Sequence, residues 1–198
     1  MVEPLSPDVV YALDGRDEIA SVNDAWNTFA TENAGTSLLP PGIIGRSLWD
    51  FIADPTTRIV YSRLFARVRS GAGASTFNFR CDSPSLKREL QMEVVASGEG
   101  TLTCTVRTLN VEARPAASIL DPALPRSGQL MVVCSWCKRV SDGKDAWVEI
   151  DQAPALYSVF DEEFPPPVSH GMCDECYSSM MRSLDDEAGL GVTNKPPA

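Results

Sequence analysis

The sequence predicts an α+β fold, in which an antiparallel sheet has helices on one face and a small β-hairpin and helix unit follows. Three runs of alternating apolar and polar residues, at 76–81, 90–96 and 101–107, are typical of strands with one buried face. Residues 56–70 carry apolar side chains at helical spacing, which predicts the longest helix. Four cysteines in two Cys-x-x-Cys pairs, within 134–176, mark the second unit.

Local signals indicate the elements that precede these strands. Residues 9–13 alternate in polarity and reach an Asp-Gly turn at 14–15, after which 19–22 can pair back as a second strand. Asn23 can cap the helix that follows, because its side chain can accept a hydrogen bond from a free backbone amide. A short apolar helical turn is expected at 45–52.

The charge balance limits the partners. The chain has 198 residues, with 17 Lys and Arg against 27 Asp and Glu, and a net charge of -10 at pH 7. Such an acidic surface repels phosphate backbones, which disfavours nucleic acid as a partner. No apolar run reaches the roughly 18 to 20 residues of a membrane span, and residues 1–7 lack a secretory pattern, so we expect a cytoplasmic protein without a membrane partner.

The order of hairpin, helices, long connecting helix and three-stranded meander over 9–113 resembles a PAS domain. The resemblance also rests on residues 19–23 leading into Ala25-Trp26, and on the run Gly-Arg-Ser-Leu-Trp-Asp-Phe at 45–51. It implies a sensory or protein-interaction module, often dimeric, that sometimes holds a cofactor between its sheet and its helices. We therefore expect a homodimer.

A small apolar ligand could lie among large side chains of this region. The candidates are Trp26, Phe29, Trp49, Phe51, Tyr61, Phe65, Phe79 and Met92. The same residues could instead only fill the core, as any buried face requires. Histidine-bound haem is disfavoured because the single histidine, His170, lies outside 9–113, and an adduct-forming flavin is disfavoured because 47–52 contains no cysteine. Cys81 and Cys104 fall on the apolar faces of their strands, so we expect both to be small buried hydrophobic residues.

The cysteine pairs predict a metal site. Two residues between cysteines let a tight turn aim both sulfurs at one point, so Cys134, Cys137, Cys173 and Cys176 can complete a tetrahedral thiolate shell. Zinc in such a closed shell is structural, because no position remains for water or substrate. A rubredoxin-type iron centre and dithiol redox chemistry share the pattern. His170 could replace one sulfur, but its expected role is to steady the turn from outside the shell.

The surrounding segment resembles a second known module. Residues 131–139, the Trp-Val-Glu run at 147–149 and residues 168–176 are together similar to a zinc-finger-like module attached to PAS or receiver domains in bacterial two-component signalling proteins. This resemblance implies a role in signalling and supports zinc as the metal.

The chain is expected to divide into five segments, and the metal to stabilise the small fourth one. The segments are an N-terminal extension (1–8), a PAS-like sensor or dimerisation domain (9–113), a proline-containing linker (114–129), a four-cysteine zinc module (130–184) and a disordered tail (185–198). Within the module, residues 131–133 and 147–150 are expected to form a hairpin, and 178–184 a helix.

These observations predict a non-enzymatic bacterial signalling or regulatory protein. PAS-like sensing or dimerisation would be coupled to a structural zinc module, and the output would pass through contacts with a protein partner. The sequence contains no Ser-His-Asp set and no phosphate-cradling glycine loop. Two alternatives remain: a thiol-based redox or metal sensor that uses the zinc-bound cysteines, and a DNA-binding transcriptional regulator.

Overall fold

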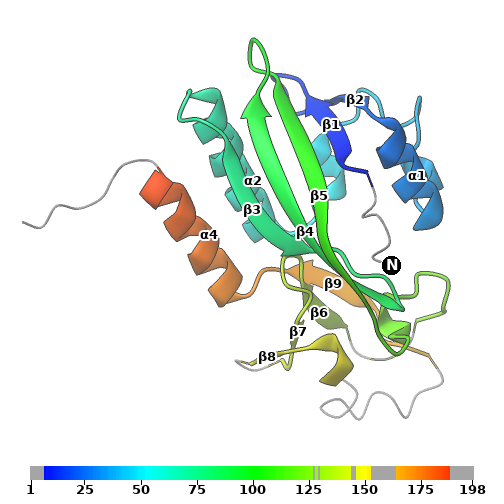
Figure 1. Cartoon of the computed structure of the whole chain (residues 1–198). Helices are drawn as coiled ribbons and strands as arrows, with labels where there is room; N and C mark the ends of the chain where they lie inside the picture. Colours follow the sequence, from blue (N-terminus) through cyan, green and yellow to red (C-terminus); the bar gives the residue numbers. More distant parts are fainter. Residues whose placement is uncertain (1–6, 127, 129, 144–145, 153–163, 188–198) are drawn as a thin grey trace, which may run out of the picture.

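The structure is a computed structural model, and it describes residues 7–126, 128, 130–143, 146–152 and 164–187. A five-stranded antiparallel sheet forms its centre, with the strand order β2-β1-β5-β4-β3 (Figure 1). The strands are β1 (Val9–Leu13), β2 (Ile19–Val22), β3 (Ser75–Arg80), β4 (Leu86–Ala96) and β5 (Leu102–Ala113). The expected hairpin and meander are both confirmed, although β5 extends six residues past the expected end at 107.

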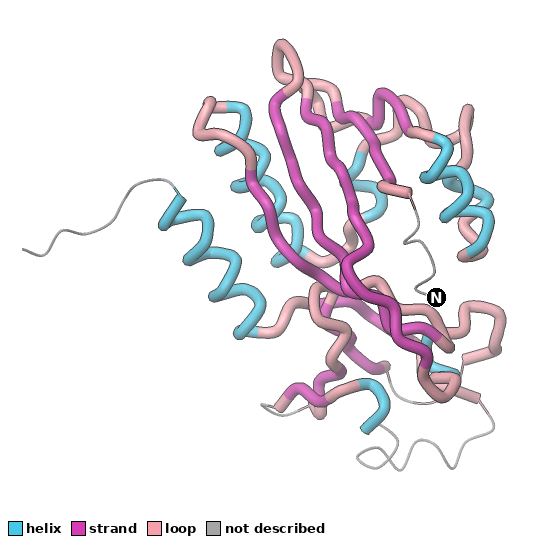
Figure 2. Tube along the Cα trace, in the orientation of Figure 1, coloured by secondary structure: helices cyan, strands magenta, loops and turns pink. Residues whose placement is uncertain are grey.

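The helices between β2 and β3 form because their first turns are capped. They are α1 (Asp24–Glu32), η1 (Thr36–Leu38), η2 (Leu48–Phe51) and α2 (Pro55–Arg69). The Asn23 side chain accepts a hydrogen bond from the Trp26 amide at 3.0 Å, and the Asp54 side chain accepts one from the Thr57 amide at 2.7 Å. Figure 2 shows these helices beside the sheet. Their element order is the one on which the resemblance to a PAS domain rests.

A buried apolar core joins the sheet to α2. Val60, Leu64 and Val68 step by four along the helix, and each is at most 1% exposed. Val94 and Leu102 face them from the sheet and are fully buried. The alternation expected for the strands and the helical spacing expected for 56–70 therefore both identify core faces correctly.

The second sheet differs from the expected hairpin. Its order is β8-β7-β6-β9, formed by β6 (Met131–Cys134), β7 (Val140–Ser141), β8 (Trp147–Val148) and β9 (Val168–Gly171). The predicted direct pairing of 131–133 with 147–150 is wrong, because β7 lies between them and pairs with both β6 and β8. The turn after Cys134 brings Val140 back opposite Val133, so β7 pairs with β6 at the place predicted for residues 147–150.

The helix α4 (Asp174–Glu187) follows β9 and is longer than the helix expected at 178–184. It packs beside α2 (Figure 1), and its Met180 and Leu184 belong to the same buried cluster as Phe65. Of the expected tail, residues 185–187 end α4 and 188–198 lie outside the described residues.

The segment expected as a linker is packed against the second sheet. It contains η3 (Ser118–Leu120), and Ile119, which is 3% exposed, lies in a small core with Met131 and Ile150. Arg126 donates hydrogen bonds to the carbonyls of Ile119 and Asp121. This part of the chain therefore adds to the second core, and the division of the chain into five segments stays a prediction. Within the described ranges, no helix combines the length and the apolar character that crossing a membrane requires.

Candidate metal centre

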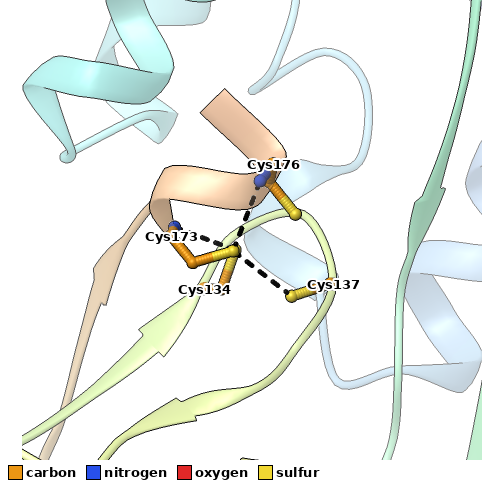
Figure 3. A group of neighbouring side chains, drawn as sticks. All are labelled: Cys134, Cys137, Cys173 and Cys176. Atoms are coloured by element: carbon orange, nitrogen blue, oxygen red, sulfur yellow. Dashed lines mark hydrogen bonds between the residues drawn. The ribbon is translucent and has the colours of Figure 1, made fainter. Parts of the chain in front are cut away.

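The four cysteines of the two pairs converge on one point (Figure 3). The Sγ atoms of Cys134, Cys137, Cys173 and Cys176 all lie within 4.8 Å of one another. A zinc ion bound tetrahedrally at about 2.3 Å from each sulfur requires sulfurs about 3.8 Å apart. The Sγ atoms of Cys137 and Cys173 are 3.9 Å apart, so the shell is close to the size that such an ion needs.

Parallel pairing of β6 with β9 brings the two cysteine pairs together. Cys134, the last residue of β6, lies opposite Gly171, the last residue of β9. Both segments leave the sheet at this point, so the turn of the first cysteine pair begins close to Cys173. The amide of Ser135 donates to the Gly171 carbonyl at 2.7 Å. A Cβ atom at position 171 would lie 3.1 Å from Cγ1 of Val132, so a larger residue there would require Val132 to shift by a few tenths of an ångström.

The turn at residues 134–139, which we call the knuckle, is held by its own backbone. The amide of Lys138 donates to the carbonyl of Cys134 at 3.1 Å, and the amide of Cys134 donates to the carbonyl of Arg139 at 2.8 Å. Lys138 adopts a positive φ of 61°, which turns the chain back toward β7. This geometry leaves both sulfurs of the first pair on the side of α4 (Figure 3).

Backbone amides donate hydrogen bonds to two of the sulfurs. The amide of Cys173 donates to Sγ of Cys134 at 3.4 Å, and the amide of Cys176 donates to Sγ of Cys173 at 3.5 Å. Hydrogen bonds from the neighbouring thiols of Cys137 and Cys176 hold the pKa of Cys134 well below its ordinary value. Burial, by contrast, raises the pKa of Cys173. The thiolate form of Cys134 is thus favoured, and a bound cation would displace the protons of the remaining thiols.

Arg139 supplies the positive charge nearest the sulfurs. Its Nε lies 3.2 Å from Sγ of Cys137, its Nη2 lies 3.8 Å from Sγ of Cys173, and the same Nη2 pairs with Glu175 at 2.5 Å. A guanidinium in this position offsets part of the charge of four thiolates around a divalent ion.

His170 is not part of the sulfur cluster. It lies on β9 opposite Val133, is exposed, and no described residue forms a hydrogen bond with its ring. Arg139 occupies the place beside the sulfurs that the sequence analysis gave to His170. Direct binding of metal by His170 is not tested by this geometry.

The donor set fits zinc. All four candidate ligands are sulfurs, and two lie at the N-terminus of α4, Cys173 directly before the helix and Cys176 in its first turn, where the helix dipole favours negative charge. Ferrous or ferric iron in a rubredoxin-type centre would use the same ligands. A shell of four sulfurs leaves no position at which a metal could activate water.

Trp136, between the two cysteines of the knuckle, enters the aromatic core of the PAS-like part. Its ring centroid lies 4.8 Å from that of Phe77, 5.7 Å from that of Tyr61 and 6.4 Å from that of Phe79. Its carbonyl accepts a hydrogen bond from the amide of Arg80 at 2.8 Å. The knuckle is therefore attached directly to β3. The sequence analysis missed this role, although a tryptophan in a tight thiol turn needs a hydrophobic surface to cover it.

A second link between the two parts is ionic. Arg80 pairs with Asp82 at 2.5 Å and with Glu149, from the C-terminal part, at 2.7 Å. Arg114 also pairs with Asp82 and with Asp151. The Asp82 side chain is fully buried, so the carboxylate that pairs with both guanidinium groups is removed from solvent.

The residues expected to line a PAS pocket separate into two groups. Phe51, Tyr61 and Phe79 line a cavity of about 340 Å³ between the PAS-like part and the knuckle. The others do not line it, and they are Trp26, Phe29, Trp49, Phe65 and Met92. Phe65 and Met92 are buried in the core, and the indole nitrogens of Trp26 and Trp49 donate to the Leu38 carbonyl and to Asp17.

The two cysteines outside the pairs differ in exposure. Cys104 is fully buried, and burial raises the pKa of its thiol to about 12. Cys81 is half-buried at the edge of the cavity, and burial raises its pKa as well. Both thiols are protonated at neutral pH, which agrees with the expectation that they behave as small hydrophobic groups.

Comparison with known proteins finds likenesses among solved structures only. No family model and no curated protein matches the chain. The photoactive yellow protein domain of the sensor histidine kinase Ppr from Rhodospirillum centenum is 24% identical, with a TM-score of 0.38, over 51% of this chain and 91% of that one. The PAS domain of Bordetella pertussis BvgS is 14% identical, with a TM-score of 0.40, over 53% of this chain and 79% of that one. The PAS domain of the Cronobacter turicensis RpfR quorum-sensing receptor, in complex with C12:0, is 16% identical, with a TM-score of 0.36, over 56% of this chain and 100% of that one. At these TM-scores the likenesses carry no conclusion about function.

Proposed function

We propose that this is a non-enzymatic signalling or regulatory protein of the bacterial two-component type, in which a structural zinc centre locks the C-terminal part onto a PAS-like sensor domain. The observation that carries the proposal is Trp136, which lies between two candidate metal ligands and packs among Tyr61, Phe77 and Phe79. We further propose that the protein acts in the cytoplasm, as a homodimer, through contacts with a protein partner.

The proposed coupling follows from the length of the knuckle. Cys134 and Cys137 enclose Trp136, so a metal that fixes both sulfurs also fixes the position of the indole ring. Met180 and Leu184 of α4 lie only a few residues after Cys176 and belong to the same buried cluster as Trp136. A change in the metal centre would thus reach the core of the sensor part without any intervening domain.

Hydrogen exchange measured by mass spectrometry tests this coupling. The zinc-loaded chain is compared with the same chain after treatment with a strong chelator. We expect removal of metal to speed exchange in β3 and α2 as well as in α4, with the amide of Arg80 as the direct reporter because it donates to Trp136. Helix α1, none of whose residues lines the cavity beside the knuckle, serves as the internal control. Faster exchange confined to residues 131–187 would contradict the proposal.

A thiol-based sensor is the second candidate. Cys137 and Cys176 are half-buried and line an open groove of about 490 Å³ between β3 and α4, so an oxidant can reach them from solvent. Peroxide titration with a chromophoric zinc indicator would measure release of the metal. Release at low peroxide together with loss of α4 protection supports this candidate, whereas retention of metal and fold opposes it.

The third candidate, a DNA-binding regulator, is opposed by the charge of the chain. The net charge of -10 becomes about -12 when one zinc ion binds four thiolates, and phosphate backbones repel such a surface. Binding to duplex DNA at low ionic strength would restore this candidate.

A further inference from the structure

We propose that the cavity between the PAS-like part and the knuckle binds a small carboxylic acid with a flat apolar body, and that Lys138 holds its carboxylate. This inference rests on the proposed function and deepens it, because it gives the sensor a ligand that touches both parts of the molecule. The cavity is a composite site, since neither part encloses it alone.

The walls of the cavity come from both parts. The PAS-like part contributes the apolar side chains of Leu48, Phe51, Ile52, Tyr61 and Phe79, and the knuckle side contributes Ser135, Trp136, Lys138 and His170. The volume of about 340 Å³ lies at the lower end of the range for ligand sites, which suits a compound with one ring and a short side chain. Aromatic walls favour a flat apolar body.

Lys138 is the one cationic group at this cavity whose charge is not already neutralised by a carboxylate among the described residues. The other is Arg80, which is paired with Asp82 and Glu149. Lys138 donates one hydrogen bond, to the Ser135 carbonyl at 3.0 Å, and forms no ion pair with a described residue. An ammonium has three donors, so two remain for a ligand oxygen.

Two further polar side chains border the cavity. Asp54 carries a negative charge, and its Oδ2 accepts hydrogen bonds from both the amide and the hydroxyl of Thr57 at 2.7 Å, which ties it to the start of α2. Partial burial of the ring and the charge of Lys138 lower the pKa of His170, against an opposing effect of Asp54, so the neutral ring is favoured at pH 7 and has one N–H to donate. No described residue accepts that hydrogen bond.

The site would depend on the metal centre. Lys138 follows Cys137 directly and is placed by the tight turn with its φ of 61°. Trp136, on the other side of Cys137, forms a wall of the same cavity. Loss of the metal would therefore remove a wall and the cation together, so ligand and metal are expected to stabilise each other's binding.

Calorimetric titration of the zinc-loaded chain with 3-phenylpropionate and with its neutral amide tests the proposal. The two probes have the same shape and differ in charge. We expect saturable binding of the acid at millimolar affinity or better, at least about tenfold tighter than the amide. In Lys138→Met, which keeps the apolar stem, the acid should bind no better than the amide. Lys87→Met, on β4, is the matched control and should bind as the unchanged chain does.

The outcomes separate the ligand from the metal. Zinc content and the circular dichroism spectrum are recorded for every sample, so a failure of the metal centre is seen independently of the titration. A zinc-loaded, folded chain that binds neither probe, or that binds acid and amide equally, overturns the proposal. Unchanged preference for the acid in Lys138→Met also overturns it, whereas loss of acid binding after chelation supports the composite site.

Discussion

Replacing Trp136 with alanine removes the side chain that joins the knuckle to the sensor core. The indole is 7% exposed and packs against Phe77, Tyr61 and Phe79. Truncating a buried aromatic residue to alanine costs about 3–5 kcal/mol, and well-oriented ring pairs add about 0.5–1.5 kcal/mol each beyond the buried area. We therefore expect Trp136→Ala to lower the free energy of unfolding by about 4 kcal/mol.

The variant should also separate two events that are joined in the unchanged chain. Urea unfolding is followed by tryptophan fluorescence and, in the same samples, by zinc release to an indicator. We expect one shared transition for the unchanged chain, and release of zinc before the loss of sheet structure in Trp136→Ala. Trp136→Phe should retain much of the stability. Trp147→Ala, which deletes a half-buried indole elsewhere in the C-terminal part, should keep the transitions joined. A loss below about 1 kcal/mol, or coincident transitions in Trp136→Ala, would refute the reasoning.

Three further predictions concern charge and thiols. Arg139→Ala should release zinc about tenfold faster in a chelator competition assay, because the guanidinium that contacts two sulfurs is lost, and equal rates would contradict this role. Asp82→Asn should cost about 3 kcal/mol in chemical denaturation, because two guanidinium groups lose a buried partner, whereas Asp8→Asn, at an exposed ion pair, should cost less than about 1 kcal/mol. Cys104, with a pKa of about 12 and no exposure, should resist iodoacetamide at pH 8 in the folded chain, and mass spectrometry showing its rapid alkylation would contradict this.

The elements of the PAS-like part could be predicted because their signals are local. The alternation of β3, β4 and β5 and the four-residue steps along α2 each report one buried face, and that face forms the core. The ends of the strands were less predictable. The last residues of β5 are exposed and still pair with β4, and no alternation of apolar and polar residues indicates this extension.

The cysteine cluster could also be predicted, because Cys-x-x-Cys spacing is a local geometric constraint. Its attachment to the sensor part could not. The ring of Trp136 reaches Phe77, which is 59 residues earlier in the chain (136 minus 77), and no periodicity reports such a contact. The packing of the proline-containing segment is similar: its prolines predict a linker, and no local pattern indicates that Ile119 is buried in the second core. Both contacts depend on which surfaces meet, a property of tertiary packing.

X-ray absorption at the zinc edge, combined with metal analysis of the purified full chain, tests the central claim most directly. The structure leads us to expect one zinc ion per chain surrounded by four sulfurs at about 2.3 Å. A chain that is folded through α4 without metal, or a shell containing nitrogen or oxygen in place of sulfur, would contradict the account.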